Sequence, residues 1–263
     1  MVRLADEIRA HQAPRGTATL WWLGQAGFAF KTGTGTVVFV DPYLSDAAHR
    51  LHGFKRLSLP PMEPEEVRAD IVVLTHEHAD HLDPDTIPVV AARNPACVFV
   101  APEGCAEELE KSGVAPGRRL LLAPGARQAV RDVTVHAGGA DHGPFSLSAV
   151  SVALDLGGVR VMASGDSSWR PDLFKPLYDL GLDVVIACIN GGFGNMGHID
   201  AARMCGESGA RIVIPCHFWT FAEQASGDPM GFVNACLQFA PKAQALLLSP
   251  GEALSVSAAR RSS

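Results

Sequence analysis

Residues 75–83 bring together side chains that commonly bind metal ions. They read Thr-His-Glu-His-Ala-Asp-His-Leu-Asp and follow an apolar run, so three imidazoles and a carboxylate fall within six residues. Helices and strands repeat a face every ~3.6 and ~2 residues, and neither period explains this spacing. A tight loop can turn alternate side chains towards two neighbouring positions. We therefore predict a metal site in which His76 and His78 serve one ion, and Asp80 and His81 the other.

Two ions need more than four ligands, and further candidates stand at the ends of predicted strands. They are His142, Asp166 and His217. Each alone would be an ordinary residue at a strand end, and the cluster upstream makes it a candidate ligand. The set then contains five histidines and two aspartates. These nitrogen and oxygen donors suit Zn²⁺, Mn²⁺ or Fe²⁺. We expect two divalent ions as cofactors, with zinc or manganese favoured.

Such a pair of ions predicts hydrolytic chemistry. Two ions about 3.5–4 Å apart lower the pKa of a shared water towards about 7, which makes a bridging hydroxide available to attack a carbonyl or phosphoryl centre. Asp80 is the predicted catalytic residue, because it can orient the hydroxide and carry a proton to the leaving oxygen. Asp41, at another strand end, is a candidate partner behind a ligand histidine, although Asp-Pro also commonly forms turns.

Three residues near the candidate ligands are predicted to contact substrate. Asn190 opens a glycine-rich loop, and Trp219 follows His217 by two positions. Core packing explains Trp219, and other aromatic residues such as Phe193, equally well. His198 precedes a predicted helix and is interpreted either as a substrate contact or as a cap of that helix.

Apolar strands must position these side chains. Three runs, 70–76, 183–190 and 211–217, are apolar until they end in polar residues, which predicts central strands covered on both faces. In open α/β sheets, ligands bind at the carboxyl ends of strands. Antiparallel strands are expected at the start of the chain, over 17–30 and 36–41. Asp83 is a predicted N-cap, followed by Pro84 at the first position of a helix that runs to about Arg93. Further predicted helices lie at 103–112, 171–180, 199–208 and 229–240.

Two short segments repeat. Leu-Leu-Leu-Ala-Pro-Gly at 120–125 recurs as Leu-Leu-Leu-Ser-Pro-Gly at 246–251, each followed by a strand-like stretch. This suggests two related halves. The alternation of strands and helices predicts an α/β protein with two sheets layered between helices.

Composition narrows the partners. The chain has 263 residues, of which 47% are hydrophobic, and a net charge of −6. This balance gives no basic field for nucleic acid or an anionic membrane, so a small-molecule substrate is expected. The six cysteines form no C-x-x-C pair, which favours reduced thiols and a cytoplasmic location. No run has the roughly 20 apolar residues of a membrane span. Leu4 and Ile8 predict a helical stripe docking on the body or on a partner subunit, which leaves a homo-oligomer open.

The motif THEHADHLD at 75–83, with GDS at 165–167 and PCH at 215–217, resembles the metal-binding motifs of the metallo-β-lactamase-fold hydrolase superfamily. The resemblance covers essentially the whole chain. Segments 21–27, 190–197 and 214–221 also resemble the branch that contains L-ascorbate-6-phosphate lactonases. The resemblance implies a four-layer αββα sandwich with two mixed sheets, formed as a single domain over 1–263 with a helical arm at 1–16.

The resemblance also assigns the ligands and an activity. It implies that Asp166 bridges two ions, one held by His76, His78 and His142 and the other by Asp80, His81 and His217. The expected activity is opening of a lactone or similar ester of a small sugar-like metabolite.

Several alternatives accompany this expectation. Hydrolysis of a small or lipid phosphodiester is the main one. A redox member of the superfamily would carry a carboxylate at the position of His78, and a non-catalytic member would not need the complete ligand set. A phosphorylated substrate would need nearby cations, and none of the candidates lies in a phosphate-binding motif. These candidates are Lys55, Arg56, Arg170 and Lys175.

Overall fold

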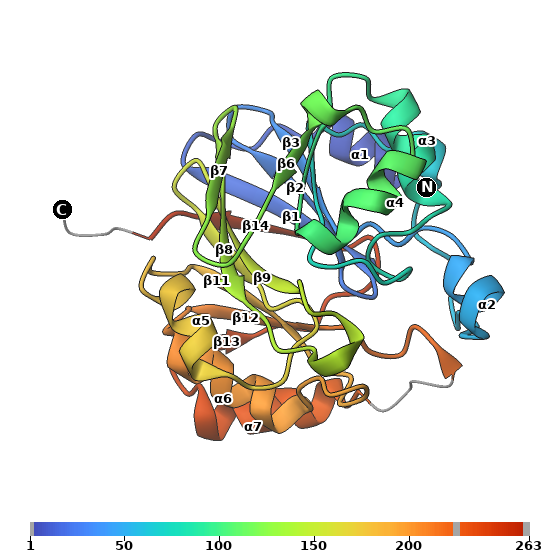
Figure 1. Ribbon diagram of the computed structural model, residues 1–263. Helices are drawn as coiled ribbons and strands as arrows, with labels where there is room; N and C mark the ends of the chain where they lie inside the picture. The colour runs from blue at the N-terminus through green and yellow to red at the C-terminus, as the bar shows by residue number, and fades with distance from the viewer. Residues whose placement is uncertain (1–2, 223–226, 260–263) are drawn as a thin grey trace.

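Two seven-stranded mixed sheets form the centre of the computed structural model, which describes residues 3–222 and 227–259 (Figure 1). The first sheet has the order β14-β1-β2-β3-β4-β5-β6 and the second β13-β12-β11-β10-β9-β8-β7. The first contains β1 (Thr17–Gly24), β2 (Gly27–Thr32), β3 (Val37–Val40), β4 (Ile71–Val73), β5 (Val98–Ala101), β6 (Arg119–Leu121) and β14 (Ala253–Ser257). The second contains β7 (Arg127–Val130), β8 (Val133–Gly139), β9 (Val150–Leu156), β10 (Arg160–Ala163), β11 (Val184–Cys188), β12 (Ile212–Cys216) and β13 (Gln244–Ala245).

Helices cover the outer faces of the sheets. Those near the first sheet include α1, α3 and α4, and those below the second sheet are α5, α6 and α7 (Figure 1). The helices are α1 (Leu4–Ala10), α2 (Ala47–His52), α3 (Thr86–Arg93), α4 (Ala106–Lys111), α5 (Pro171–Tyr178), α6 (His198–Ser208) and α7 (Pro229–Phe239). Short 3-10 turns are η1 (Pro64–Glu66), η2 (Glu103–Cys105), η3 (Pro116–Arg118) and η4 (Gly143–Phe145). The expected α/β architecture of two mixed sheets between helices is confirmed.

The two sheets share one layout. In the first, β14, β1, β2 and β3 pair antiparallel, and β3 to β6 pair parallel. In the second, β7 to β10 pair antiparallel, and β10 to β13 pair parallel. The repeated segments at 120–125 and 246–251 lie at equivalent places, where the chain leaves the last parallel strand of one sheet and enters the edge strand of the other. The two halves predicted from the repeat are therefore related in topology.

The central strands are buried on both faces, as their apolar sequences predict. In β4, Ile71 and Val73 face the core between the sheets, whereas Val72 faces the core beneath the helices of the first half. This alternation follows from the two-residue period of a strand. The six cysteines are all buried as free thiols.

The N-terminal helix docks on the body of the chain. Leu4 and Ile8 of α1 are buried in the core of the first half. The Lys31 ammonium reaches the end of this helix and donates to the carbonyls of Ile8 and Arg9 at 2.9 and 2.8 Å. Of the predicted arm over 1–16, the helix occupies Leu4–Ala10, and residues 1 and 2 lie outside the described part.

The strand ends bring the candidate ligands to one edge of the molecule. The motif loop follows β4, and His142, Asp166 and His217 lie beyond the ends of β8, β10 and β12. Sequence-distant groups meet there because the parallel strands β4, β10 and β12 direct their carboxyl ends to this edge. β8 lies in the antiparallel part of its sheet but runs in the same direction as β10, since both pair antiparallel with β9. Within the described residues, no helix is long and apolar enough to span a bilayer.

Candidate metal centre

The motif loop, residues 75–83, is a tight turn that is held in place by the buried carboxylate of Asp83. His78 O accepts from the amides of His81 and Leu82 at 2.9 and 2.8 Å. Asp83 is fully buried, and its carboxylate accepts from the amides of Leu44 and Thr86, among other donors. The sequence predicts Asp83 as the N-cap of the following helix, but α3 begins at Thr86 with Asp85 at its N-cap position, and Asp83 instead accepts from the Thr86 amide. The anchored turn explains how closely spaced side chains point into one site.

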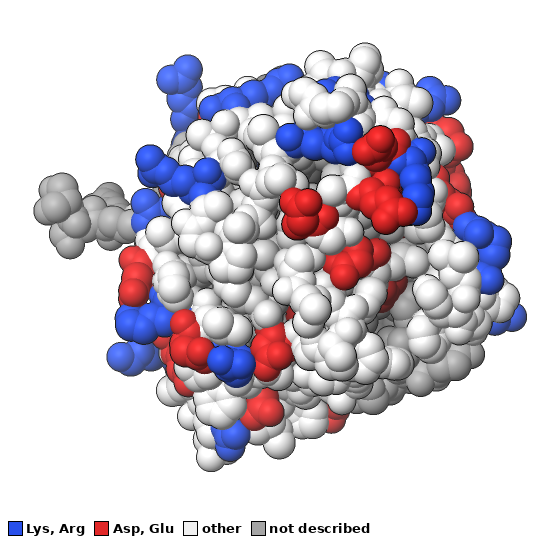
Figure 2. Space-filling view, viewed as in Figure 1, with Lys and Arg blue, Asp and Glu red and all other residues white. Residues whose placement is uncertain are grey.

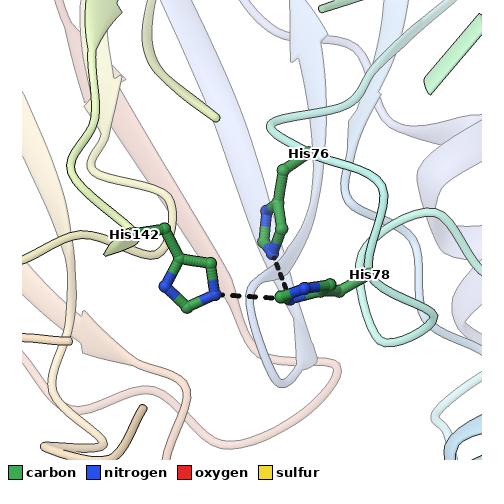
Figure 3. Close-up of side chains that lie close together, drawn as sticks. All are labelled: His76, His78 and His142. Atoms are coloured by element: carbon green, nitrogen blue, oxygen red, sulfur yellow. Dashed lines mark hydrogen bonds between the residues drawn. The ribbon is translucent and has the colours of Figure 1, made fainter. Parts of the chain in front are cut away.

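Three histidine nitrogens form the first donor group. His76 Nε2 lies 3.0 Å from His78 Nδ1, and His142 Nε2 lies 3.3 Å from the same atom. Figure 3 shows the rings of His76 and His78, from the motif loop, turned towards His142. The loop after β4 and the loop after β8 thus supply one cluster of imidazole nitrogens from the two halves of the chain.

Hydrogen bonds on the far side of two rings fit the tautomers in which the facing nitrogens carry lone pairs. His78 Nε2 donates to the carbonyl of Phe145 at 3.0 Å. His76 Nδ1 lies 3.1 Å from the hydroxyl of Thr75, which itself donates to Asp41. Burial lowers the pKa of both His76 and His142. Neutral rings with lone pairs directed at one point are what a metal ion requires of histidine.

A second donor group lies beside the first and contains a carboxylate. Asp80 Oδ2 is 3.4 Å from His217 Nε2 and 3.9 Å from His81 Nε2. His81 and His217 are both buried. This group joins the motif loop to the end of β12, so it too draws on both halves.

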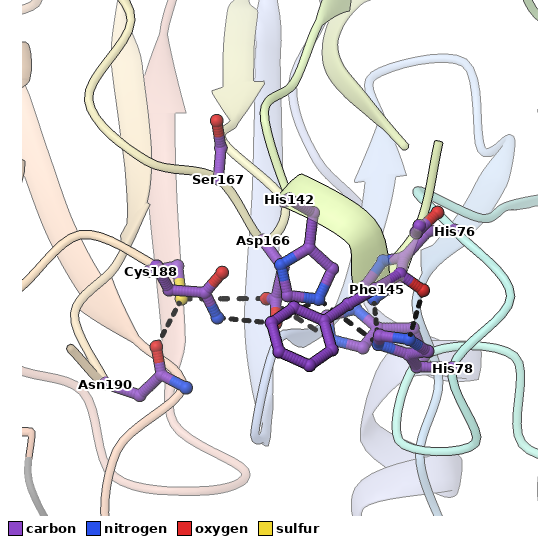
Figure 4. A network of polar contacts seen from close by, with 12 residues as sticks. His76, His78, His142, Phe145, Asp166, Ser167, Cys188 and Asn190 are labelled. Atoms are coloured by element: carbon purple, nitrogen blue, oxygen red, sulfur yellow. Dashed lines mark hydrogen bonds and ion pairs between the residues drawn. The ribbon is translucent and has the colours of Figure 1, made fainter. Parts of the chain in front are cut away.

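Asp166 stands between the two groups. Its Oδ1 lies 3.3 Å from His81 Nε2 and 3.4 Å from His217 Nε2, whereas Oδ2 lies 3.9 Å from His142 Nε2. The carboxylate is held by the Asn195 side-chain amide at 2.7 Å, and the Cys188 thiol lies 3.6 Å from it (Figure 4). One carboxylate therefore contacts both donor groups, with one oxygen directed at each.

The protonation states of the second group differ from those of the first. Burial lowers the pKa of His81 and His217, but the charges of Asp166 and other nearby carboxylates outweigh burial, and the net pKa of both rings is raised. Burial raises the pKa of Asp80 and Asp166, but the neighbouring histidines outweigh it and lower both well below the usual range. In this second donor group the ionised carboxylates of Asp80 and Asp166 therefore stabilise a positive charge on the rings of His81 and His217.

The donor set fits divalent metal ions. One buried ring nitrogen that faces the centre, His81 Nε2, has no hydrogen-bond partner among the described residues. His81 Nε2 faces the carboxylates of Asp80 and Asp166, where a cation would satisfy all three groups. An unpaired buried polar atom is costly unless something binds it. Burial raises the pKa of Cys188 well above its usual value, so its thiol stays protonated, and the nitrogen and oxygen donors form the better ligand set.

Asp41 lies behind the second group, where the sequence suggests a supporting carboxylate. His81 Nδ1 donates to Asp41 Oδ2 at 2.8 Å, which directs the other ring nitrogen at Asp80 and Asp166. Asp41 also accepts from the Thr75 amide at 2.8 Å and from the Thr75 hydroxyl at 2.6 Å. Through Thr75 the same carboxylate reaches His76, so it orients one histidine of each group.

Gln25 is a site residue that the sequence analysis does not identify. It lies in the turn between β1 and β2, is almost fully buried, and donates its side-chain amide to Asp80 Oδ2 at 2.7 Å. Its backbone carbonyl accepts from the His217 amide at 3.0 Å. Gln25, Asp41 and His217 all have positive φ, between 43° and 59°, a conformation that non-glycine residues rarely adopt. The sequence signal that could point to Gln25 is its polar side chain at the tip of a hairpin, and this signal is weak.

Five of the donor residues line a cavity of about 800 Å³, namely His78, Asp80, His142, Asp166 and His217. Asn190, a predicted substrate contact, lines this cavity with its side chain beside Cys188 (Figure 4). His198 does not lie among the described residues that line it and instead begins α6. Trp219 lines a separate cavity of about 410 Å³, because its positive φ of 54° turns the chain away after His217. The geometry thus brings Asn190 to the centre but neither His198 nor Trp219.

Comparison with known proteins identifies the class. The family model described as Beta-lactamase superfamily domain matches residues 36–218, and the chain belongs to this family. The resemblance seen in the sequence motifs is confirmed. A metallo-β-lactamase fold protein of Bacillus subtilis superposes with a TM-score of 0.68 at 18% identity, over 91% of this chain and 100% of that one. This likeness establishes the fold.

Two curated relatives are more similar in sequence. A UPF0173 metal-dependent hydrolase of Cupriavidus taiwanensis is 29% identical over 92% of this chain and 87% of its own length. A probable L-ascorbate-6-phosphate lactonase of Salmonella paratyphi B is 27% identical over 81% of this chain and 73% of its own length.

Proposed function

We propose that this metal-dependent hydrolase of the metallo-β-lactamase superfamily uses two divalent ions to open a lactone or similar ester of a small sugar-like metabolite. The observation that carries the proposal is the position of Asp166, whose two oxygens face two separate donor groups at the base of one cavity. A shared carboxylate is the arrangement that holds two ions close together. The similarity to a probable lactonase supports the choice of ester.

The residues divide the work between holding ions and handling protons. His76, His78 and His142 would hold one ion, and Asp80, His81 and His217 the other. Bound ions would act as Lewis acids and lower the pKa of water. Zinc and manganese both suit these donors.

Asp80 is the group best placed to handle protons. Its carboxylate lines the cavity and is partly exposed, whereas Asp166 is buried and held by Asn195. Both carboxylates line the cavity, and Asp80 is the more exposed of the two. The Gln25 amide fixes one oxygen of Asp80, which leaves the other free to accept a proton from water and pass it to the leaving oxygen.

The test is to measure bound metals in the purified protein and to assay zinc- and manganese-loaded samples against lactones, linear esters and phosphodiesters. We expect two ions per chain and lactone turnover that Asp80→Asn reduces by at least ~10²-fold. Asp132→Asn is the control, because Asp132 is a surface aspartate that accepts from the hydroxyls of Thr34 and Thr36 and does not line the cavity. Faster hydrolysis of a phosphodiester than of any lactone would replace the proposed substrate, and near wild-type activity of Asp80→Asn would refute the role of Asp80.

A further inference from the structure

Three phenylalanine rings from separate segments meet at the cavity that contains the metal centre. Phe54 follows α2, Phe145 ends η4, and Phe193 lies in the loop between β11 and α6. The Phe193 ring centroid is 6.1 Å from that of Phe54 and 5.9 Å from that of Phe145, both edge to face. Phe145 and Phe193 are 49% and 47% exposed. Large apolar side chains this exposed, gathered in a cavity rather than scattered, indicate a surface that binds something.

Phe145 places one of these rings directly beside the donor groups. Its carbonyl accepts from His78 Nε2, and its ring centroid lies 5.6 Å from that of His142. Figure 4 shows the Phe145 ring next to His142 and His78. A substrate bound at the metal centre can therefore contact this ring.

Phe193 is held in place by the same loop that supports Asp166. At the base of the loop, Asn195 donates to Asp166 Oδ2, and the Met196 amide donates to the Ser167 carbonyl at 2.9 Å. At its tip, Phe193 has a φ of 55° although it stands between two glycines. A bulky residue at positive φ is uncommon and points to a functional constraint. The loop thus fixes an exposed ring relative to the metal centre.

The charged side chains around the cavity, considered apart from the ions of the metal centre, do not favour an anionic substrate. Its basic side chains include Arg50 and Lys111, and both already form ion pairs, Arg50 with Asp85 at 2.6 Å and Lys111 with Glu107 at 2.9 Å. Glu77 and Glu108 add further negative charge to the lining. Figure 2 shows acidic and basic side chains intermingled over the region of α4. Neither Arg50 nor Lys111 is therefore left unpaired to bind a phosphate group.

We infer that the cavity selects an uncharged lactone or ester that carries an apolar group, aryl or medium-length alkyl, and that this group packs against Phe54, Phe145 and Phe193. The inference rests on the proposed function and narrows it, because it excludes a phosphorylated sugar lactone as the preferred substrate. The three rings determine specificity, whereas the donor groups perform the reaction.

The experiment compares three lactones of one ring size with the metal-loaded protein: unsubstituted, alkyl- or phenyl-substituted, and phosphorylated. We expect the apolar lactone to have the highest kcat/KM. Phe193→Ala should lower its advantage over the unsubstituted lactone about tenfold, mainly through KM, since contacts in an apolar pocket discriminate on this scale. Phe193→Leu should retain part of the advantage. Leu237→Ala is the control, because Leu237 is an exposed apolar residue on α7, away from the cavity.

The outcomes separate the two proposals. Preference for the phosphorylated lactone, or an unchanged ratio in Phe193→Ala, overturns the inference while lactone hydrolysis itself stands. If no lactone or ester is hydrolysed, the proposed function fails, and an NMR titration still tests the cavity. Benzyl alcohol should then bind more weakly to Phe193→Ala than to the wild-type protein. Equal binding of benzyl alcohol, or tighter binding of glycerol phosphate, would overturn the inference.

Discussion

Replacing Asp41 by asparagine should weaken metal binding at the second donor group while leaving the fold intact. The carboxylate is buried and accepts three hydrogen bonds, from the amide and hydroxyl of Thr75 and from His81 Nδ1. An asparagine oxygen can replace one carboxylate oxygen but not both. If it accepts from the Thr75 amide, its NH₂ group faces His81 Nδ1. The ring must then carry its proton on Nε2, the atom that faces Asp80 and Asp166.

The size of the effect follows from these contacts. Loss of a partner behind a ligand histidine typically costs about 10–100-fold in metal affinity, which corresponds to about 1.4–2.8 kcal/mol. Flipping the amide restores His81 but sets its NH₂ against the Thr75 amide, and a buried donor without an acceptor costs about 1–3 kcal/mol. Either orientation is therefore unfavourable. A modest loss of stability should accompany the loss of affinity.

Calorimetric titration of the metal-free protein with zinc is the assay. The wild-type protein should bind two ions. Asp41→Asn should bind the ion at Asp80, His81 and His217 about 10–100-fold more weakly. The ion at His76, His78 and His142 should lose less affinity, because Asp41 reaches His76 only through the Thr75 hydroxyl. Asp132→Asn should behave as wild type. Wild-type affinity for both ions in Asp41→Asn would refute the reasoning that Asp41 sets the proton position on His81.

Three further predictions follow from the same geometry. Chelation should abolish activity reversibly and lower the melting temperature, because an ion at about 100 times its Kd stabilises the fold by about 2.7 kcal/mol; unchanged activity after verified metal removal would contradict the metal centre itself. Zinc affinity should rise from pH 6 to pH 8. The nearby carboxylates outweigh burial and raise the pKa of His81 and His217, so protons compete with the ion below those pKa values. Calorimetry in two buffers should detect proton release, and equal zinc affinity at both pH values would contradict this prediction. Gln25→Leu should lower kcat by about 10–100-fold while two ions remain bound. The control is Gln128→Leu, because the Gln128 side-chain amide lies at the surface and donates to the Leu121 carbonyl. An unchanged kcat in Gln25→Leu would exclude Gln25 from positioning Asp80.

The layout of the fold, and the set of side chains that come together at the candidate metal centre, could be predicted because both depend on local sequence patterns. The apolar runs that end in polar residues predict β4, β11 and β12, and the repeated Pro-Gly segments predict two halves. The motif loop places four donors within six residues. His142, Asp166 and His217 lie far away in sequence, but their position at strand ends brings them to the same edge.

Contacts made across loops could not be predicted in the same way. Gln25 and Phe54 meet the site because a hairpin turn and a loop after α2 fold back on it, and no periodicity records such contacts. Trp219 follows a ligand in sequence yet lines another cavity, because the backbone turns sharply at positive φ. Nearness to a ligand in sequence therefore predicts nearness in space along a strand but not around a turn.

Anomalous diffraction from crystals soaked with zinc or manganese would test the two-ion centre most directly. We expect two peaks per chain, one among His76, His78 and His142 and one among Asp80, His81 and His217, with Asp166 between them. A single peak, or peaks away from these side chains, would contradict the central claim that the two halves of the chain meet to hold a pair of ions.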